Sequence, residues 1–142
     1  MDHDTFIGEV QNRAELASRG EALSATRATL QTLAERIEEG QATNLAAQLP
    51  DELARYLEED ADTTDSFDFQ EFVSRVAERD ENLADGDEDD ARSAAALHAR
   101  VVTDVLEEAI TEGQLEDVHS QLPDEYDELF ELAEAEQHPG QS

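Results

Sequence analysis

The chain of 142 residues contains no cysteine, no lysine and no tryptophan, and only 5% of its residues are aromatic. The absence of cysteine excludes disulfides, thiolate metal ligands and cysteine nucleophiles together. The longest uninterrupted apolar run, residues 94–97, is far too short to cross a bilayer. Four of the first fifteen residues are acidic, unlike the basic start of a signal peptide, so we expect a cytoplasmic protein without a cleaved leader.

Positive charge is also scarce, because nine arginines stand against 38 acidic residues and the formal net charge is -29. A surface of this sign repels phosphate, which excludes nucleic acids and anionic membranes as partners. The acidic excess, the use of arginine without lysine and the few aromatics resemble proteins of halophiles that accumulate salt. At about 1 M salt the Debye length is roughly 3 Å, so repulsion between surface carboxylates largely disappears. We therefore expect solvent cations to balance this charge.

The chain repeats itself with a long period. The segment from Gly40 to Glu52 returns 73 residues later as Gly113 to Glu125, and both copies contain Gln-Leu-Pro-Asp-Glu. Between residues 33 and 52, eleven of twenty positions are identical at that spacing. Nearer the N-terminus the spacing of matching residues falls to 66. The second copy therefore carries seven additional residues, which we place in the acidic stretch 82–91.

These spacings predict the organisation of the chain. Residues 1–58 form repeat 1, residues 67–132 form repeat 2, and residues 60–66 link them. We expect one domain at 1–133, in which the repeats pack with pseudo-twofold symmetry, and a flexible tail at 134–142. A single repeat can bury little apolar surface alone, which favours mutual burial over the alternative of two independently folded bundles.

Apolar residues in both copies follow helical spacing and no stretch alternates as a strand does, so we predict an all-α fold with four helices in each repeat. The second helix of each copy is long, and its wide apolar arc indicates contacts on two sides. We expect Gly40 and Gly113 to end these long helices as C′ residues, and Pro50 and Pro123 to begin the fourth helices. The long helices are predicted at about 18–39 and 89–112.

The first helix of the second copy has a marked beginning. Asp68 and Glu71 have the spacing of a capping box, and Phe67 and Phe72 have that of a hydrophobic staple. Asp2 occupies the position of Asp68 in the first copy. We therefore predict that both first helices start immediately after an aspartate.

Two copies of a helical unit with an arginine in the middle of the long helix, followed by a glycine and by Gln-Leu-Pro-Asp-Glu, resemble the domain of unknown function family 2267. The resemblance covers about residues 2–132. This family occurs in haloarchaea and in bacteria. It implies a compact helical domain, no established activity and no catalytic residues, and the acidic insert of the second copy departs from its compact repeat.

Two patterns are candidates for a metal site. The acidic run 85–90 has acids at positions 1, 3 and 5 of a helix-loop-helix calcium loop, but the glycine of position 6 and the acid of position 12 are missing. Glu116 and His119 have the Glu-x-x-His spacing of di-iron bundles, yet the first copy has Thr43 and Ala46 in their place. We expect an exposed loop and an exposed helix face instead, with no metal and no cofactor.

The sequence holds no pattern typical of an enzyme. None of the four histidines recurs between the copies, and no nucleophile elbow, phosphate loop or dinucleotide fingerprint occurs. Acid pairs are too plentiful to single out one acid–base couple. We therefore expect a protein without catalytic residues.

Four arginines recur at equivalent positions: Arg27 and Arg100 in the long helices, and Arg13 and Arg79 at the ends of the first helices. One interpretation makes them receptors for anions or carboxylates. The other is an internal bridge to carboxylates or to carbonyls at helix ends, and we predict it for Arg27 and Arg100, both substantially buried. The acceptors expected at the start of the fourth helices are Asp51 and Glu52 in repeat 1, and Asp124 and Glu125 in repeat 2.

The sequence thus predicts a non-enzymatic structural or protein-interaction module of a halophile cytoplasm. A homo-oligomer or another protein is its expected partner. Two alternatives stay open. One is a small-ligand or anion-binding module that uses the duplicated arginines, and the other is an acidic decoy that binds basic proteins.

The charge generates a first prediction. When KCl is dialysed to low millimolar levels, the helical circular dichroism signal should fall, because unscreened carboxylates then repel one another. A far-ultraviolet titration from molar to millimolar KCl measures this. An unchanged spectrum at low salt would remove the main support for the halophile interpretation.

Overall fold

The computed structural model describes residues 1–58, 66–83 and 86–130, and within these ranges every regular element is a helix. The predicted all-α fold is confirmed. The tail at 134–142 and all of the linker at 60–66 except Ser66 lie outside the described residues. In chain order the elements are α1 (His3–Arg13), α2 (Arg19–Arg36), α3 (Glu39–Ala46), α4 (Asp51–Glu58), α5 (Phe69–Arg79), α6 (Glu88–Ala109), α7 (Glu112–Ser120) and the 3-10 helix η1 (Asp124–Phe130).

The predicted aspartate caps of α1 and α5 are confirmed. Asp2 accepts a hydrogen bond from the backbone N–H of Thr5 at 2.8 Å, and Asp68 accepts one from the N–H of Glu71 at 2.8 Å. Each carboxylate thereby satisfies an amide that has no partner within its own helix. Glu71 turns its own carboxylate toward Arg75, so the capping box forms only in one direction.

The prediction that Gly40 and Gly113 end the long helices was wrong. Helices α2 and α6 end four residues before them, and Ile37 and Ile110 follow in extended conformation with their side chains buried. Both glycines lie in the first turn of the next helix, and no described glycine has a positive φ. The β-branched isoleucines favour extended backbone, and burying them turns the chain before either glycine is reached.

The fourth helices begin directly after Pro50 and Pro123, as predicted, but they differ in type. After Pro50 the chain forms the α-helix α4, whereas after Pro123 it forms the 3-10 helix η1. Three residues per turn place Tyr126 and Leu129 on one side of η1, where both are buried. Tyr126 donates its hydroxyl to the carbonyl of Phe67 at 2.7 Å, and burial raises the pKa of Tyr126 to about 12.

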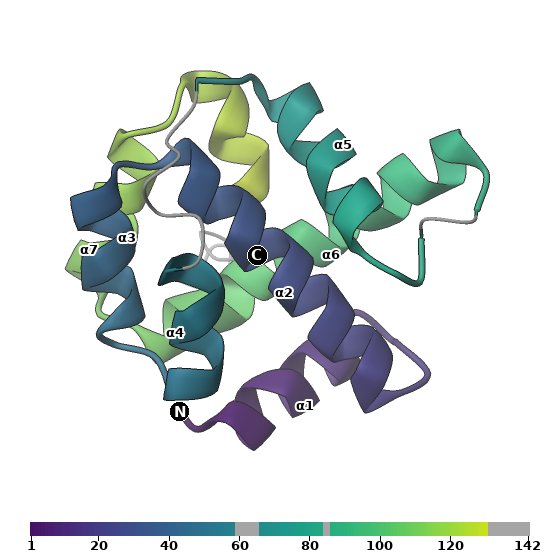
Figure 1. Ribbon diagram of the computed structural model, residues 1–142, viewed down its shortest axis with the longest axis horizontal. Helices are drawn as coiled ribbons and strands as arrows, with labels where there is room; N and C mark the ends of the chain where they lie inside the picture. Colours follow the sequence, from purple (N-terminus) through teal and green to yellow (C-terminus); the bar gives the residue numbers. More distant parts are fainter. Residues whose placement is uncertain (59–65, 84–85, 131–142) are drawn as a thin grey trace, which may run out of the picture.

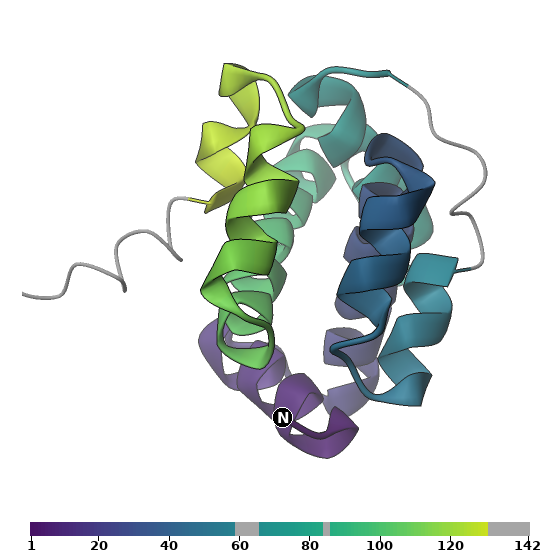
Figure 2. The same cartoon turned by 90° about the vertical axis from the view of Figure 1, so that its left-hand side faces the viewer.

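The long helices α2 and α6 cross at the centre of the molecule (Figure 1). Both α1 and α5 pack against both of them, so that α1 lies along one end of the long helices and α5 along the other (Figure 2). Helices α3 and α4 flank α2, and α7 and η1 flank α6. The buried apolar side chains of all these elements form one contiguous core. None of the described helices is both long and apolar enough to cross a membrane.

Candidate functional site

Arg13 links the end of α1 to the side of α6. Its guanidinium lies 2.7 Å from Asp104 and also contacts Glu108, both on α6, and it binds Glu9 one turn back at 2.8 Å. The side chain of Asp104 is 5% exposed. Burial disfavours the charge on Arg13, but the three carboxylates outweigh this effect and raise its pKa.

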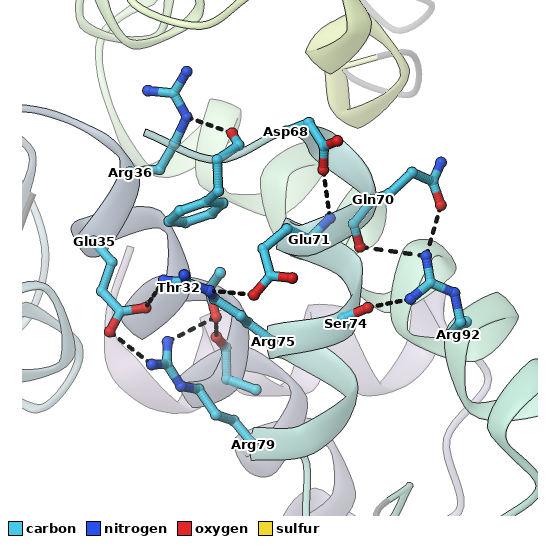
Figure 3. A network of polar contacts seen from close by, with 12 residues as sticks. Thr32, Glu35, Arg36, Asp68, Gln70, Glu71, Ser74, Arg75, Arg79 and Arg92 are labelled. Carbon is cyan, nitrogen blue, oxygen red and sulfur yellow. Dashed lines mark hydrogen bonds and ion pairs between the residues drawn. The ribbon is translucent and has the colours of Figure 1, made fainter. Parts of the chain in front are cut away.

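Arg79 makes the corresponding link from the end of α5 to α2. Its guanidinium lies 2.7 Å from Glu35 and donates to the hydroxyl of Thr32 at 3.0 Å (Figure 3). Arg75 shares the same carboxylate at 3.2 Å. Burial favours the neutral form of Glu35, yet the two guanidinium groups hold the pKa of Glu35 below its ordinary value.

These two links occupy matching positions. Arg79 follows Arg13 by 66 residues, and Glu108 follows Glu35 by 73, the two spacings at which the sequence repeats. In each case an arginine from one half of the chain binds a glutamate from the other half. Of the two interpretations of Arg13 and Arg79, the structure thus places both in internal bridges.

Arg27 and Arg100 are also paired within the chain, but with other partners than predicted. Arg27 binds Glu81 at 3.2 Å, and Arg100 binds Glu128 at 3.2 Å. Their side chains are 34% and 24% exposed, so they are less buried than expected. Glu81 is the second residue after α5, and its backbone N–H donates to Ser24, one turn before Arg27 on α2, so its carboxylate lies within reach of Arg27. Arg100 does contact η1, the helix that was expected to supply its acceptor, but it binds the last turn of η1 instead of the first.

The four carboxylates predicted as acceptors therefore have other surroundings. Asp51, Glu52 and Asp124 are exposed to solvent. Glu125 accepts a hydrogen bond from the backbone N–H of Phe69 at 2.9 Å, at the start of α5. None of them meets a duplicated arginine among the described contacts.

A third matched pair of arginines escaped the sequence analysis. Arg19 donates to the carbonyl of Asp4 at 3.5 Å and to its carboxylate at 3.1 Å. Arg92, 73 residues later, donates to the carbonyl of Gln70 at 3.3 Å and to its side-chain oxygen at 2.6 Å, and also binds Ser74 (Figure 3). The spacing of 73 was the signal that could have found this pair.

The glutamines of the repeated Gln-Leu-Pro-Asp-Glu segments connect the two halves, a role that the sequence did not reveal. Gln48 accepts from the backbone N–H of Thr111 at 2.8 Å and donates to Gln114 at 3.2 Å. Gln121 accepts from the N–H of Glu38 at 3.2 Å and donates to Gln41 at 3.0 Å. The backbone N–H groups that donate to the two glutamines belong to Glu38 and Thr111, the residues that cap α3 and α7. We call these four contacts the glutamine clasp.

A buried polar cluster ties α2, α5 and α6 together at the end of α5. Asp80 is fully buried, and one of its oxygens accepts from Ser24 and from the N–H of Asn82, both at 3.0 Å. Its other oxygen lies 3.4 Å from Nδ1 of His98. Burial favours the neutral form of Asp80, but His98 and the donating groups lower its pKa.

This cluster contains serine, histidine and aspartate, but its geometry is not that of a nucleophile and its base. Ser24 donates its proton to Asp80 and accepts from the N–H of Glu81 at 3.0 Å. The histidine faces the carboxylate, not the hydroxyl. The arrangement therefore positions helices and leaves no activated oxygen.

Of the two metal candidates, only one falls within the described residues in full. His119 binds Asp127 at 2.7 Å, and its ring stacks on Phe130 with the centroids 4.1 Å apart. Glu116 and His119 line one shallow depression of the surface. The part of the chain that the structure describes brings no three histidines or acids together as metal ligands. Asp85, the first residue of the acidic run, lies outside it.

Comparison with known proteins places the chain in one family. A sequence profile of the family described as an uncharacterized conserved protein, DUF2267, matches residues 3–129. No curated protein matches the chain.

The glutamine clasp generates a second prediction. Gln48→Ala and Gln121→Ala should each lower the free energy of unfolding by about 0.5–1.5 kcal/mol, because each removes the side-chain acceptor of an exposed backbone amide. Urea unfolding in molar KCl measures the loss. Gln11→Ala, on α1 and outside the clasp, is the matched control and should change stability by less. Equal effects of all three substitutions would contradict a role for the clasp.

The buried carboxylate generates a third prediction. Because the pKa of Asp80 is lowered in the folded chain, its stabilisation is present above the unfolded value of about 3.9 and disappears as the pH falls through the folded value. The difference in unfolding free energy between the wild type and Asp80→Asn should therefore be constant near neutral pH and shrink below about pH 4.

Chemical unfolding of both chains between pH 7 and pH 3 tests this dependence. Asp117→Asn changes an exposed carboxylate on α7 and serves as the control, with little difference from wild type at any pH. A difference for Asp80→Asn that stays constant down to pH 3 would show that its carboxylate makes no charge-dependent contribution.

Proposed function

This chain belongs to the DUF2267 family, and we propose that it is a non-enzymatic structural or protein-interaction module of a halophile cytoplasm. The observation that supports the proposal is the position of the arginine side chains. Within the described residues, eight of the nine arginines donate to carboxylates, side-chain oxygens or carbonyls of the chain itself. Most of the positive charge is therefore paired within the chain, and the surface that other molecules contact carries mainly carboxylates.

The same proposal includes two repeats related by a pseudo-twofold axis within one domain. Three sets of contacts support it, because each occurs twice at residues 66 or 73 apart. They are the links of Arg13 and Arg79, the backbone contacts of Arg19 and Arg92, and the two sides of the glutamine clasp. One core shared by both halves favours mutual burial over two separate bundles.

The acidic exterior fits a solvent rich in cations. Exposed carboxylates such as Asp51, Glu52 and Asp124 have no arginine beside them in the described contacts, so solvent cations are their natural counterions. In molar salt the repulsion among such groups is screened over roughly 3 Å. Solvation of this kind explains the charge without a dedicated basic partner.

The anion-binding alternative has less support. Arg27 faces Glu81, and Arg100 faces Glu128, so an anion must displace a carboxylate of the chain at either place. The surrounding charge of the protein opposes the approach of an anion as well. We therefore favour internal bridges as the role of both arginines.

A thermal-shift experiment in molar KCl separates these functions and is the fourth prediction. Phosphate, sulfate and carboxylate anions, added at constant ionic strength, should not raise the melting temperature beyond the general effect of salt. A specifically bound ligand at 100 times its Kd would stabilise the fold by about 2.7 kcal/mol. A rise that is lost in Arg27→Gln and Arg100→Gln, but kept in Arg55→Gln, would overturn the proposal in favour of anion binding.

The decoy alternative is tested with a basic peptide such as polyarginine. Attraction by charge alone should give binding at low salt that disappears in molar KCl. Binding that persists in molar KCl would favour the decoy, because it requires specific contacts beyond long-range charge.

A further inference from the structure

We infer that the surface joining residues 1–58 to residues 66–130 also fits a second copy of this chain, with the two halves exchanged between the copies. We call this surface the half-to-half interface. It consists of the contacts of α1 with α6, of α2 with α5 and α6, and of α3 with α7. The inference rests on the proposed interaction role and names the partner as another molecule of the same protein.

One ion pair of the half-to-half interface occurs in both directions. Arg13 of the first half binds Glu108 of the second, while Arg79 of the second half binds Glu35 of the first. Glu35 is only 15% exposed in its side chain, and its two arginine partners both come from the second half. At these matching positions each half offers the other an arginine and a glutamate, which is the pattern of a self-complementary surface, and Arg75 and Asp104 of the second half are additional partners.

The glutamine clasp is reciprocal in the same way. Gln48 of the first half reaches Thr111 and Gln114 of the second. Gln121 of the second half reaches Glu38 and Gln41 of the first. Contacts that recur with the donor and acceptor halves interchanged, as these do, are the arrangement found in a twofold homodimer.

Nothing in these contacts requires that both halves belong to one polypeptide. The backbone passes between the halves once, through residues 59–65 of the sequence. If the first half of one copy meets the second half of another, every ion pair and every clasp contact described above is formed again. Two copies then make two complete half-to-half interfaces and leave none open.

Concentration and salt decide between the closed chain and the exchanged pair. Covalent connection gives the closed form an effective concentration in the millimolar range, so exchange requires abundant protein or refolding in the presence of a second copy. Two chains with a net charge of -29 each repel at low ionic strength, and molar salt removes most of that repulsion. Exchange is therefore a high-salt property of this protein.

Full-length chains with complementary charge reversals test the inference. Arg79→Glu and Glu35→Arg each place like charges at the same contact, which weakens either closed chain alone. The two are mixed in urea at high concentration and refolded in molar KCl. In an exchanged pair, the first half of the Arg79→Glu chain meets the second half of the Glu35→Arg chain, and that unit has the wild-type sequence. The other unit pairs an arginine at 35 with a glutamate at 79.

The expected result is a dimer in sedimentation and a melting temperature above that of either variant refolded alone. The matched control mixes Arg79→Glu with Glu108→Arg, two lesions in the same half. Every combination of halves then carries a lesion, so no stabilised dimer should form. This control also distinguishes exchange from association of closed chains, because closed chains would form dimers to the same extent in both mixtures.

Each outcome of this experiment either supports the exchanged pair or contradicts it. If either variant fails to fold alone, recovery of helicity only in the complementary mixture supports exchange. Monomers in both mixtures, or equal dimers in both, overturn the exchanged pair. Such a failure leaves the anion thermal-shift result untouched, whereas a specific anion effect would overturn the proposed function without affecting exchange.

Discussion

Arg13 and Arg79 each carry a positive charge from the end of a short helix onto a glutamate of the long helix in the opposite half of the chain, and the packing of the two halves depends on them. Each arginine also meets a largely buried acid, Asp104 for Arg13 and Glu35 for Arg79, and such a carboxylate without its partner is costly. With 38 acids and nine arginines, the chain has little positive charge available to pair with its carboxylates. Concentrating it at the contacts between halves stabilises the places where carboxylates are least hydrated.

The glutamine clasp stabilises the same boundary by a different physical means. Amide hydrogen bonds carry no net charge, so salt screens them less than it screens an exposed ion pair. Gln48 and Gln121 also satisfy backbone amides at the starts of α7 and α3, which have no acceptor within those helices. Ion pairs and amide contacts thus act together, and the amide contacts keep their strength where concentrated salt weakens the exposed ion pairs.

The cluster around Asp80 has no counterpart in the first half. The positions that match Asp80, His98 and Ser24 hold Ala14, Ala25 and Leu97. It lies at the end of α5, directly before the acidic stretch 82–91. A buried carboxylate that binds α2 and α6 at this point fixes the end of α5 whatever the length of the segment that follows. The second half is therefore anchored by contacts that the first half does not need.

The sequence by itself determined the helical class, the aspartate caps of α1 and α5 and the recurrence of arginines, because these depend on spacing and on neighbours within a few residues. The sequence did not predict where the long helices end, because burial of Ile37 and Ile110 outweighed the local preference for glycine at a C-cap. Only the tertiary structure decided the partners of Arg27 and Arg100, the clasp of Gln48 and Gln121 and the burial of Asp80 with His98. With 38 carboxylates available, sequence spacing cannot select an acceptor, whereas the crossing of α2 and α6 brings specific residues within bonding distance.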